Sequence, residues 1–166
     1  MIKIYEDGLC TPTILKWKEG DEVLISDPIG DWDLSEWLVA DDLLVLAAGS
    51  GWTPMVELLR RKLELNDSAK ISAFYFNKSE RDIVDDGWMP FRWHDKRIKI
   101  THVLSRSTDE WKGIKGRISK ELFEDHTSQK STQRVIVCGP DGFIQSALSI
   151  LADLDYAVDQ VHVFQG

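Results

Sequence analysis

The chain has 166 residues, enough for one domain or slightly more. Its 28 acidic and 20 basic residues give a formal charge of −8, which argues against wrapping nucleic acid or binding an anionic membrane. Hydrophobic residues make up 43% and charged residues 29%, a balance typical of folded soluble proteins that argues against disorder. No apolar run approaches the roughly 20 residues that a membrane span needs.

The cysteines and histidines limit the disulfide and metal chemistry that the chain can support. Cys10 and Cys138 stand far apart, which is no disulfide framework and indicates a reducing compartment such as the cytosol. The four histidines show no metal-ligand spacing, and two cysteines cannot complete a structural zinc site. We therefore expect no metal.

Residues 1–40 consist of short alternating pieces. A strand is predicted at residues 22–26, directly after a turn at residues 19–21. The region is too short to bury a core of its own. We interpret residues 1–40 as the C-terminal part of a truncated β-rich domain and residues 41–166 as a second domain.

From Leu43 onward, apolar runs alternate with helical patterns. The continuous run at residues 43–47 is typical of a strand buried on both faces. Thr53 is expected to cap the following helix, because Pro54 then occupies its first position. Further strands are predicted at 71–76, 98–104, 135–138 and 161–164, with helices near 55–63, 79–86, 119–123 and 144–151. The alternation predicts an α/β fold with a five-stranded parallel sheet and helices on both faces.

Two glycine-containing loops follow the first and fourth predicted strands. If the strand order is 3-2-1-4-5, the first and fourth strands lie side by side where the direction of the strand order reverses. Parallel sheets bind ligands at this position, beyond the carboxyl ends of the strands. The first strand runs into Ala48-Gly49 and the fourth into Cys138-Gly139. The sequence therefore predicts that the two loops face each other across one crevice.

The first loop, at residues 49–54, follows a strand and opens a helix. Glycines allow close backbone approach, and the free N–H groups at a helix start attract phosphate. The common dinucleotide fingerprint would place glycine where Pro54 stands. A phosphate site and a merely tight strand-to-helix turn both remain open on these grounds.

The second loop, at residues 138–143, begins with a cysteine at a strand end. Such a thiol could act as a nucleophile. A buried free cysteine is more often inert packing, and both readings remain open.

Taken together, these segments resemble the nucleotide domain of the ferredoxin reductase superfamily, and in particular its cytochrome b5 reductase branch. That branch carries GGTGITPM after the first strand, where residues 48–55 read AGSGWTPM. An NxSExDI pattern follows the second strand, as at residues 77–83, and CGPxxF follows the fourth, as at residues 138–143. The branch ends just after an aromatic residue, as Phe164 does here.

The resemblance implies hydride transfer from NADH or NADPH to FAD, then electron transfer to the haem of a cytochrome b5 domain in the same full-length chain. It implies that Cys138, Ser50 and Thr53 border the point where nicotinamide meets flavin. It also implies nucleotide-binding residues, which are Gly49, Gly51, Pro54, Asn77, Asp82, Ser105, Arg106, Gly139, Pro140, Phe143 and Phe164. A bulky Trp52 ring is expected near the cofactor path.

The same resemblance gives a role to the first region. Residues Gly8, Leu9, Cys10 and Thr11 match the family segment that closes the FAD-binding β-barrel. The family's earlier RxYS flavin motif is not found, so we expect FAD to be bound mainly by a segment outside this chain. The fragment alone should then be inactive. A cytoplasmic location, including the cytosolic face of the endoplasmic reticulum, is expected.

The pair Ser105-Arg106 bears on nucleotide choice. By resemblance, NADPH-using members place a Ser-Arg pair here, where the arginine fork can hold the 2′-phosphate. Glu80 and Asp82 could instead repel that phosphate, and Arg106 could be a solvated loop charge. We predict that NADPH is accepted alongside NADH.

Two other functions remain open from the sequence. The chain could belong to a thiol-dependent enzyme that uses Cys138, in which case alkylation would inactivate it without protection by nicotinamide. It could also be a non-catalytic nucleotide-binding module. A longer, flavin-containing protein that oxidises no NAD(P)H would support that last reading.

Overall fold

The computed structural model describes residues 2–27, 33, 35–84, 95–123 and 132–164. The chain divides into two compact units, Met1–Leu34 and Ser35–Gly166. The division falls a few residues before the boundary at 40 that the sequence suggested. Residues 35–40 lie in the second unit because they begin with a helix, α2 (Ser35–Val39), that packs against a longer helix of that unit.

The first unit contains one short helix, α1 (Thr11–Ile14), among its described residues. The Thr11 hydroxyl donates to the carbonyl oxygen of Tyr5 at 3.1 Å and accepts from the Tyr5 amide at 2.9 Å. The strand predicted at residues 22–26 is not formed, so that prediction was wrong for this chain. A strand needs a neighbour for its backbone hydrogen bonds, and the described residues of this unit pair none with it. Leu24 is consequently fully exposed.

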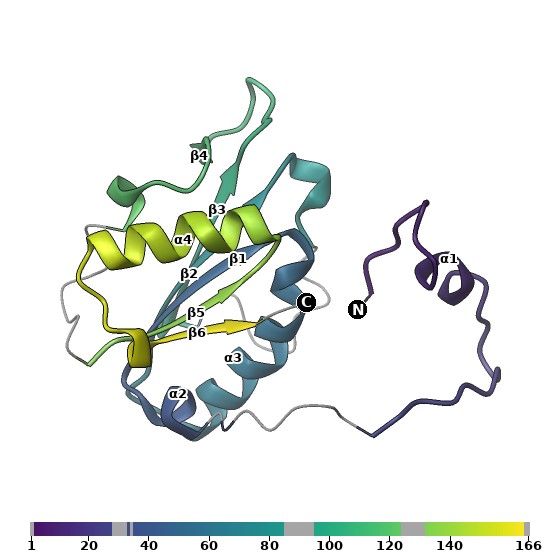
Figure 1. The fold of residues 1–166 in the computed structure, drawn as a ribbon, viewed down its shortest axis with the longest axis horizontal. Helices are drawn as coiled ribbons and strands as arrows, with labels where there is room; N and C mark the ends of the chain where they lie inside the picture. The colour runs from purple at the N-terminus through teal and green to yellow at the C-terminus, as the bar shows by residue number, and fades with distance from the viewer. Residues whose placement is uncertain (1, 28–32, 34, 85–94, 124–131, 165–166) are drawn as a thin grey trace. The chain divides into compact units, whose positions relative to one another are not determined.

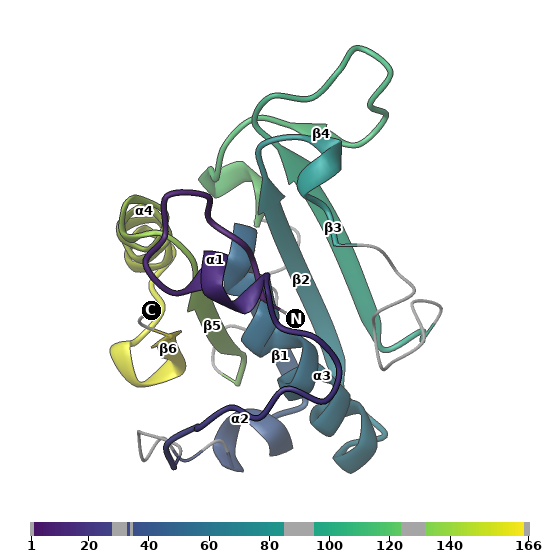
Figure 2. The ribbon, with the colours of Figure 1, turned by 90° about the vertical axis from the view of Figure 1, so that its right-hand side faces the viewer.

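The second unit is built on a parallel sheet with strand order β4-β3-β2-β1-β5-β6 (Figure 1). The strands are β1 (Asp42–Ala48), β2 (Lys70–Asn77), β3 (Ile98–Leu104), β4 (Ile114–Lys115), β5 (Arg134–Cys138) and β6 (Val161–Phe164). The five predicted strands and their order are confirmed. The additional strand, β4, pairs only two residues with the edge of β3, too few to produce a sequence period. Figure 2 shows β2 and β3 running side by side over their length.

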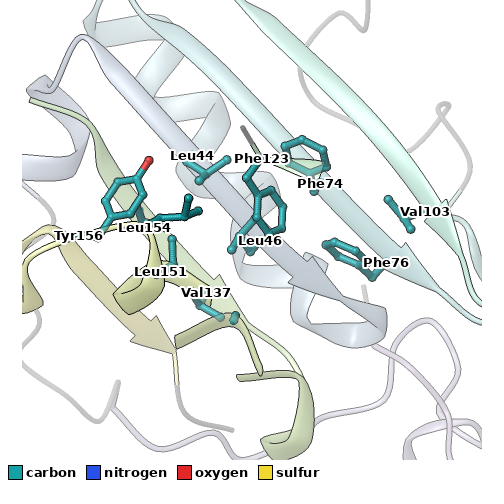
Figure 3. Close-up of a cluster of buried hydrophobic side chains, with 12 residues drawn as sticks. Leu44, Leu46, Phe74, Phe76, Val103, Phe123, Val137, Leu151, Leu154 and Tyr156 are labelled. Carbon is teal, nitrogen blue, oxygen red and sulfur yellow. The ribbon is translucent and has the colours of Figure 1, made fainter. Parts of the chain in front are cut away.

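Two long helices cover the sheet, α3 (Thr53–Leu65) and α4 (Asp141–Asp153). Alternate residues of β1 and β2 point to one side of the sheet, where Leu44 and Phe74 pack with Leu151 of α4 (Figure 3). The other face is covered by α3, whose buried side chains include Met55 and Leu59. Both faces are therefore apolar, which explains why the central strands read as continuous hydrophobic runs.

A buried lysine attaches α2 to α3. Lys62 is fully buried, and its ammonium donates to the carbonyl oxygens of Trp37 at 2.8 Å, Leu38 at 3.2 Å and Ala40. Burial lowers the pKa of Lys62 to about 8. These acceptors lie at the end of α2, where helical carbonyl groups lack internal partners. The lysine thus satisfies backbone groups that would otherwise be buried unpaired.

Shorter elements connect these pieces. The 3-10 turns are η1 (Gly49–Trp52), η2 (Glu80–Asp82), η4 (Lys120–Leu122) and η6 (Val158–Gln160). The helices predicted near residues 79–86 and 119–123 are thus single 3-10 turns where they are described, and residues 85 and 86 lie outside the described part. No helix in the described ranges combines the length and the apolar character that crossing a membrane requires.

Candidate nucleotide-binding site

The loops after β1 and β5 touch at the carboxyl edge of the sheet. A Cβ built on Gly51 would lie 2.4 Å from the carbonyl oxygen of Cys138, so only glycine permits this contact. A Cβ built on Gly139 would likewise lie 2.9 Å from Cβ of Ala48. The prediction that these two loops face each other is confirmed. Gly51 is needed for this packing of the two loops, and its role in admitting a pyrophosphate stays a prediction.

The turn η1, which leads directly into α3, presents its first backbone N–H groups at this edge. Gly49 has a φ of +55°, a conformation that favours glycine, and it turns the chain from β1 into η1. Pro54 is the second residue of α3 and not the first, as the sequence had suggested, but it still lies in the first turn, which tolerates proline. Thr53 is not the cap that we expected, because it is already the first helical residue and its hydroxyl donates to the Ser50 carbonyl oxygen at 2.9 Å. The Thr53 amide donates to the Ser50 carbonyl oxygen, and Pro54 has no N–H. The groups that attract an anion here are therefore the first N–H groups of η1, which lack internal partners.

Trp52 lies beneath this edge and not in a cofactor path. Its side chain is fully buried, and its ring stacks on Tyr75 with centroids 4.7 Å apart and planes 16° apart. The expectation that Trp52 borders the cofactor path was therefore wrong. Trp52 is the last residue of η1, and Tyr75 belongs to β2. The stacked rings therefore pack the loop between β1 and α3 against the neighbouring strand.

Cys138 ends β5 and is half-buried as a free thiol. Its position aligns with Ala47 on one neighbouring strand and Phe164 on the other. Burial raises the pKa of the Cys138 thiol, so the thiol is protonated at neutral pH. A reactive cysteine needs the opposite shift, and this speaks against the thiol-dependent enzyme.

The loop after β5 leads into α4. Pro140 is exposed and precedes the first residue of α4. The ring of Phe143 lies 5.1 Å from that of Phe76, centroid to centroid, and packs against the core cluster on the α4 side. Phe143 therefore anchors the loop after β5 to the hydrophobic core.

The ends of β2 and β3 form the second half of the site. The Asn77 carbonyl oxygen accepts from the Ser105 amide at 3.0 Å. The Asn77 side chain is buried, and its amide makes no hydrogen bond of normal geometry. Burial raises the pKa of Tyr75, and the neighbouring Asn77 amide opposes that rise. A buried polar group of this kind is usually satisfied by water or a ligand.

The acidic residues after β2 are committed to local hydrogen bonds. The Asp82 carboxylate accepts from the Ser79 amide at 3.0 Å and the Ser79 hydroxyl at 2.8 Å. The Glu80 carboxylate accepts from the Thr108 amide at 3.0 Å and the Thr108 hydroxyl at 2.8 Å. Arg106 is exposed in the loop between these contacts. The acids thus serve as structural acceptors.

The structure brings most predicted site residues to one edge of the second unit. The residues at the β1 and β5 ends are Gly49, Ser50, Gly51, Thr53, Pro54, Cys138, Gly139 and Pro140, with Phe164 at the end of β6. Those near the β2 and β3 ends are Asn77, Asp82, Ser105 and Arg106. Gly8, Leu9, Cys10 and Thr11 belong to the first unit and are described by themselves. The contact between Glu80 and Thr108 was missed, because no sequence pattern links residues 28 positions apart.

Residues 45–148 match the family described as the oxidoreductase NAD-binding domain. The fold, the two touching loops and the helix start that follows β1 agree with this match. The chain therefore belongs to the oxidoreductase NAD-binding domain family.

Within that class, the similar proteins are cytochrome b5 reductases, which confirms the resemblance seen in the sequence. The chain is 36% identical to cytochrome b5 reductase 4 of Bos taurus and of Homo sapiens, over 99% of its own length. It is 28% identical to NADH-cytochrome b5 reductase 2-A of Vanderwaltozyma polyspora, over 99% of this chain and 61% of that protein. It spans only 32% of the length of the cytochrome b5 reductase 4 proteins.

Solved structures agree with these relatives. The CS-b5R domains of human Ncb5or, solved in the NAD+ form, match with a TM-score of 0.89 and 36% identity. The match covers 99% of this chain and 48% of that one. A flavohemoglobin from Malassezia yamatoensis matches with a TM-score of 0.74 at 21% identity, over 98% of this chain and 42% of that one, which supports the fold alone.

The residues at this edge fit a dinucleotide. The first N–H groups of η1, which begins at Gly49 and leads into α3, are placed to bind a pyrophosphate. Arg106 supplies an exposed cation at the neighbouring loop, and the Asn77 amide is a buried polar group without a normal hydrogen bond. Among the described residues there is no cluster of side chains that could hold a metal ion.

Proposed function

We propose that this chain is the nucleotide-binding part of a flavin-dependent oxidoreductase. The full protein would pass hydride from NADH or NADPH to FAD and then single electrons to a cytochrome b5-type haem. The observation that carries this proposal is the direct contact between the loops after β1 and β5, which sets Cys138 beside the turn η1 that leads into α3. The NAD-binding family and relatives named cytochrome b5 reductases support it.

When bound, the nicotinamide supplies a hydride and the flavin accepts it. The chain's own residues bind and orient. The first N–H groups of η1 would bind the pyrophosphate, while the hydrogen bond from the Thr53 hydroxyl to the Ser50 carbonyl oxygen fixes this turn. The Cys138 thiol stays protonated, because burial raises its pKa, so it borders the reacting rings as a neutral group. Holding reactants at about 3–3.5 Å accounts for much of the rate in such reactions.

We assign the flavin contact of this chain to residues 8–11. Gly8 lies in a tight turn, because a Cβ there would approach the Thr11 hydroxyl at 2.8 Å. Leu9 is almost fully exposed, and Cys10 is also exposed. These four residues offer a small exposed surface, so the larger part of FAD would be bound by residues outside this sequence.

The electron acceptor that we propose is a cytochrome b5 haem domain within the same full-length protein. The names of the relatives support a cytochrome b5 partner. We also propose a cytoplasmic site of action, including the cytosolic face of the endoplasmic reticulum. Two unpaired cysteines, Cys10 and Cys138, support a reducing compartment.

Calorimetric titration of this chain with NAD+ and NADH tests the nucleotide site, and we expect saturable binding. Stopped-flow reduction of a longer, flavin-containing protein then tests the reaction. Hydride transfer should appear as bleaching of the flavin absorption. Absence of binding would contradict the nucleotide site, and binding without flavin reduction would support a non-catalytic module. Robust NADH oxidation by this chain alone, without flavin, would contradict the assignment of residues 1–40.

A further inference from the structure

The Glu80 carboxylate joins the loop after β3 to the turn after β2, in addition to backbone hydrogen bonds between the two segments. Glu80 belongs to η2, and its carboxylate accepts from both the amide and the hydroxyl of Thr108, at 3.0 and 2.8 Å. A hydrogen bond from the Glu80 backbone amide lowers the pKa of the Glu80 carboxyl most, and the two bonds from Thr108 and the charge of Lys115 lower it further. The carboxylate is therefore ionised and doubly bonded at neutral pH.

Thr108 is held from its other side as well. Its carbonyl oxygen accepts from the Lys115 ammonium at 3.0 Å and from the Trp111 amide at 3.4 Å. The residues before it are fixed to the end of β2, because the Arg106 amide donates to the Lys78 carbonyl oxygen at 2.7 Å. Arg106 thus stands on a loop segment that is fixed at both ends, while its side chain is exposed.

We propose that Glu80 is a specificity-determining positioning residue, which holds the Arg106 loop in place to bind the 2′-phosphate of NADPH. This inference rests on the proposed nucleotide site. Arginine binds phosphate through a planar fork, so its benefit depends on where its backbone is held. The sequence alone suggested the opposite role for Glu80, namely repulsion of that phosphate. The Glu80 carboxylate accepts two hydrogen bonds from Thr108, and the nearby charge of Lys115 favours its ionised form, so its negative charge is partly compensated.

Three variants distinguish a Glu80 that positions the Arg106 loop from a Glu80 that repels the 2′-phosphate. Glu80→Gln removes the charge but keeps an oxygen that accepts from Thr108. Glu80→Ala removes both the charge and the acceptor. Glu110→Gln is the matched control, because Glu110 is an exposed carboxylate on the same loop and its loss changes the net charge equally. Each variant is titrated calorimetrically with NADPH and with NADH.

We expect Glu80→Ala to weaken NADPH binding by about tenfold and NADH binding by less than about twofold, the size of coupling found between interacting residues. Glu80→Gln and Glu110→Gln should stay close to the wild type. Adding Arg106→Ala to Glu80→Ala should weaken NADPH binding less than Arg106→Ala weakens it in the wild type. Tighter NADPH binding in both Glu80 variants would overturn the proposal in favour of repulsion, and equal losses for both nucleotides would overturn it as well.

Amide hydrogen exchange tests the attachment without any nucleotide. In Glu80→Ala, the amides of Thr108 and Arg106 should exchange at least about tenfold faster, because opening of the loop then breaks fewer bonds. Glu80→Gln should retain their protection. Unchanged exchange in Glu80→Ala would overturn the positioning role even if NADPH binds. Failure of the wild type to bind either nucleotide, with faster exchange in Glu80→Ala, would contradict the nucleotide site and leave the attachment standing.

Discussion

Gly51 packs so closely on the end of β5 that a Cβ at this position would lie 2.4 Å from the carbonyl oxygen of Cys138. Neither partner can move easily, because both contacting groups are backbone. The contact joins the loop that would bind the pyrophosphate to the strand end that carries the thiol. The geometry of the site therefore depends on the absence of one methyl group.

Gly51→Ala should separate the two loops and destabilise the second unit. We expect a loss of about 1–3 kcal/mol in the free energy of unfolding, as for other overpacked positions, together with weaker NAD+ binding. Urea unfolding and calorimetry measure the two effects. Gly142→Ala is the matched control, because a Cβ on Gly142 meets nothing within 4 Å. Equal effects of the two substitutions would contradict the importance of the Gly51 contact.

Cys138→Ala in the flavin-containing protein should slow turnover more than it weakens nucleotide binding. The thiol is proposed to lie where the two rings meet, so its loss should affect the transition state rather than binding in general. Steady-state kinetics give kcat and KM separately, and thermal unfolding checks the packing role. An unchanged kcat with a raised KM would count against this role, as would a variant that is merely less stable.

Arg106→Ala should weaken NADPH binding by about 1.5–3 kcal/mol, the usual contribution of hydrogen bonds to charged groups. NADH binding should hardly change, because NADH lacks the 2′-phosphate. Competition between the two nucleotides in a calorimetric titration measures the difference. Equal losses for both, or a wild-type protein that does not use NADPH, would show that Arg106 is only a solvated loop charge.

His162 should make the stability of the second unit depend on pH. Its ring meets Trp37 edge to face, with centroids 5.6 Å apart, and Phe164 at 5.2 Å. Burial lowers the pKa of His162, so below the unfolded value of about 6.5 the unfolded chain binds more protons than the folded one. The free energy of unfolding should therefore fall as the pH drops from about 6.5 toward the lowered folded pKa.

The variant His162→Phe keeps an aromatic ring and removes the titrating group. Thermal unfolding of both proteins between about pH 5 and 7.5 should show a steeper loss of stability for the wild type. Parallel curves would mean that His162 does not titrate differently in the folded state.

The fold could be predicted from the sequence more completely than the roles of the site residues. The run at residues 43–47 and the helical spacing around Leu59 predicted the sheet and α3, because burial on both faces leaves a periodic signal. Strand β4 was missed because two residues are too few to show an alternating hydrophobic pattern. The strand at residues 22–26 was wrongly predicted because an unpaired segment can have the same composition as a paired strand.

At the site, the sequence identified the loops but not what several side chains do in them. Trp52 turned out to be a buried support, and its stacking on Tyr75 depends on a neighbouring strand that local spacing does not reveal. The Glu80 carboxylate bonds a residue 28 positions away. Such contacts are set by the crossover connections of the sheet, so they become visible only once the strands are placed.

Lys62 has a consequence for chemical labelling. The lowered pKa of Lys62 is caused by its burial, so the exposed amine would have the reactivity of an ordinary lysine toward acylating reagents. Its complete burial against the end of α2 prevents this reaction in the closed state. The rate at which Lys62 becomes acylated would therefore report how often α2 detaches from α3, at a single residue and without an added probe.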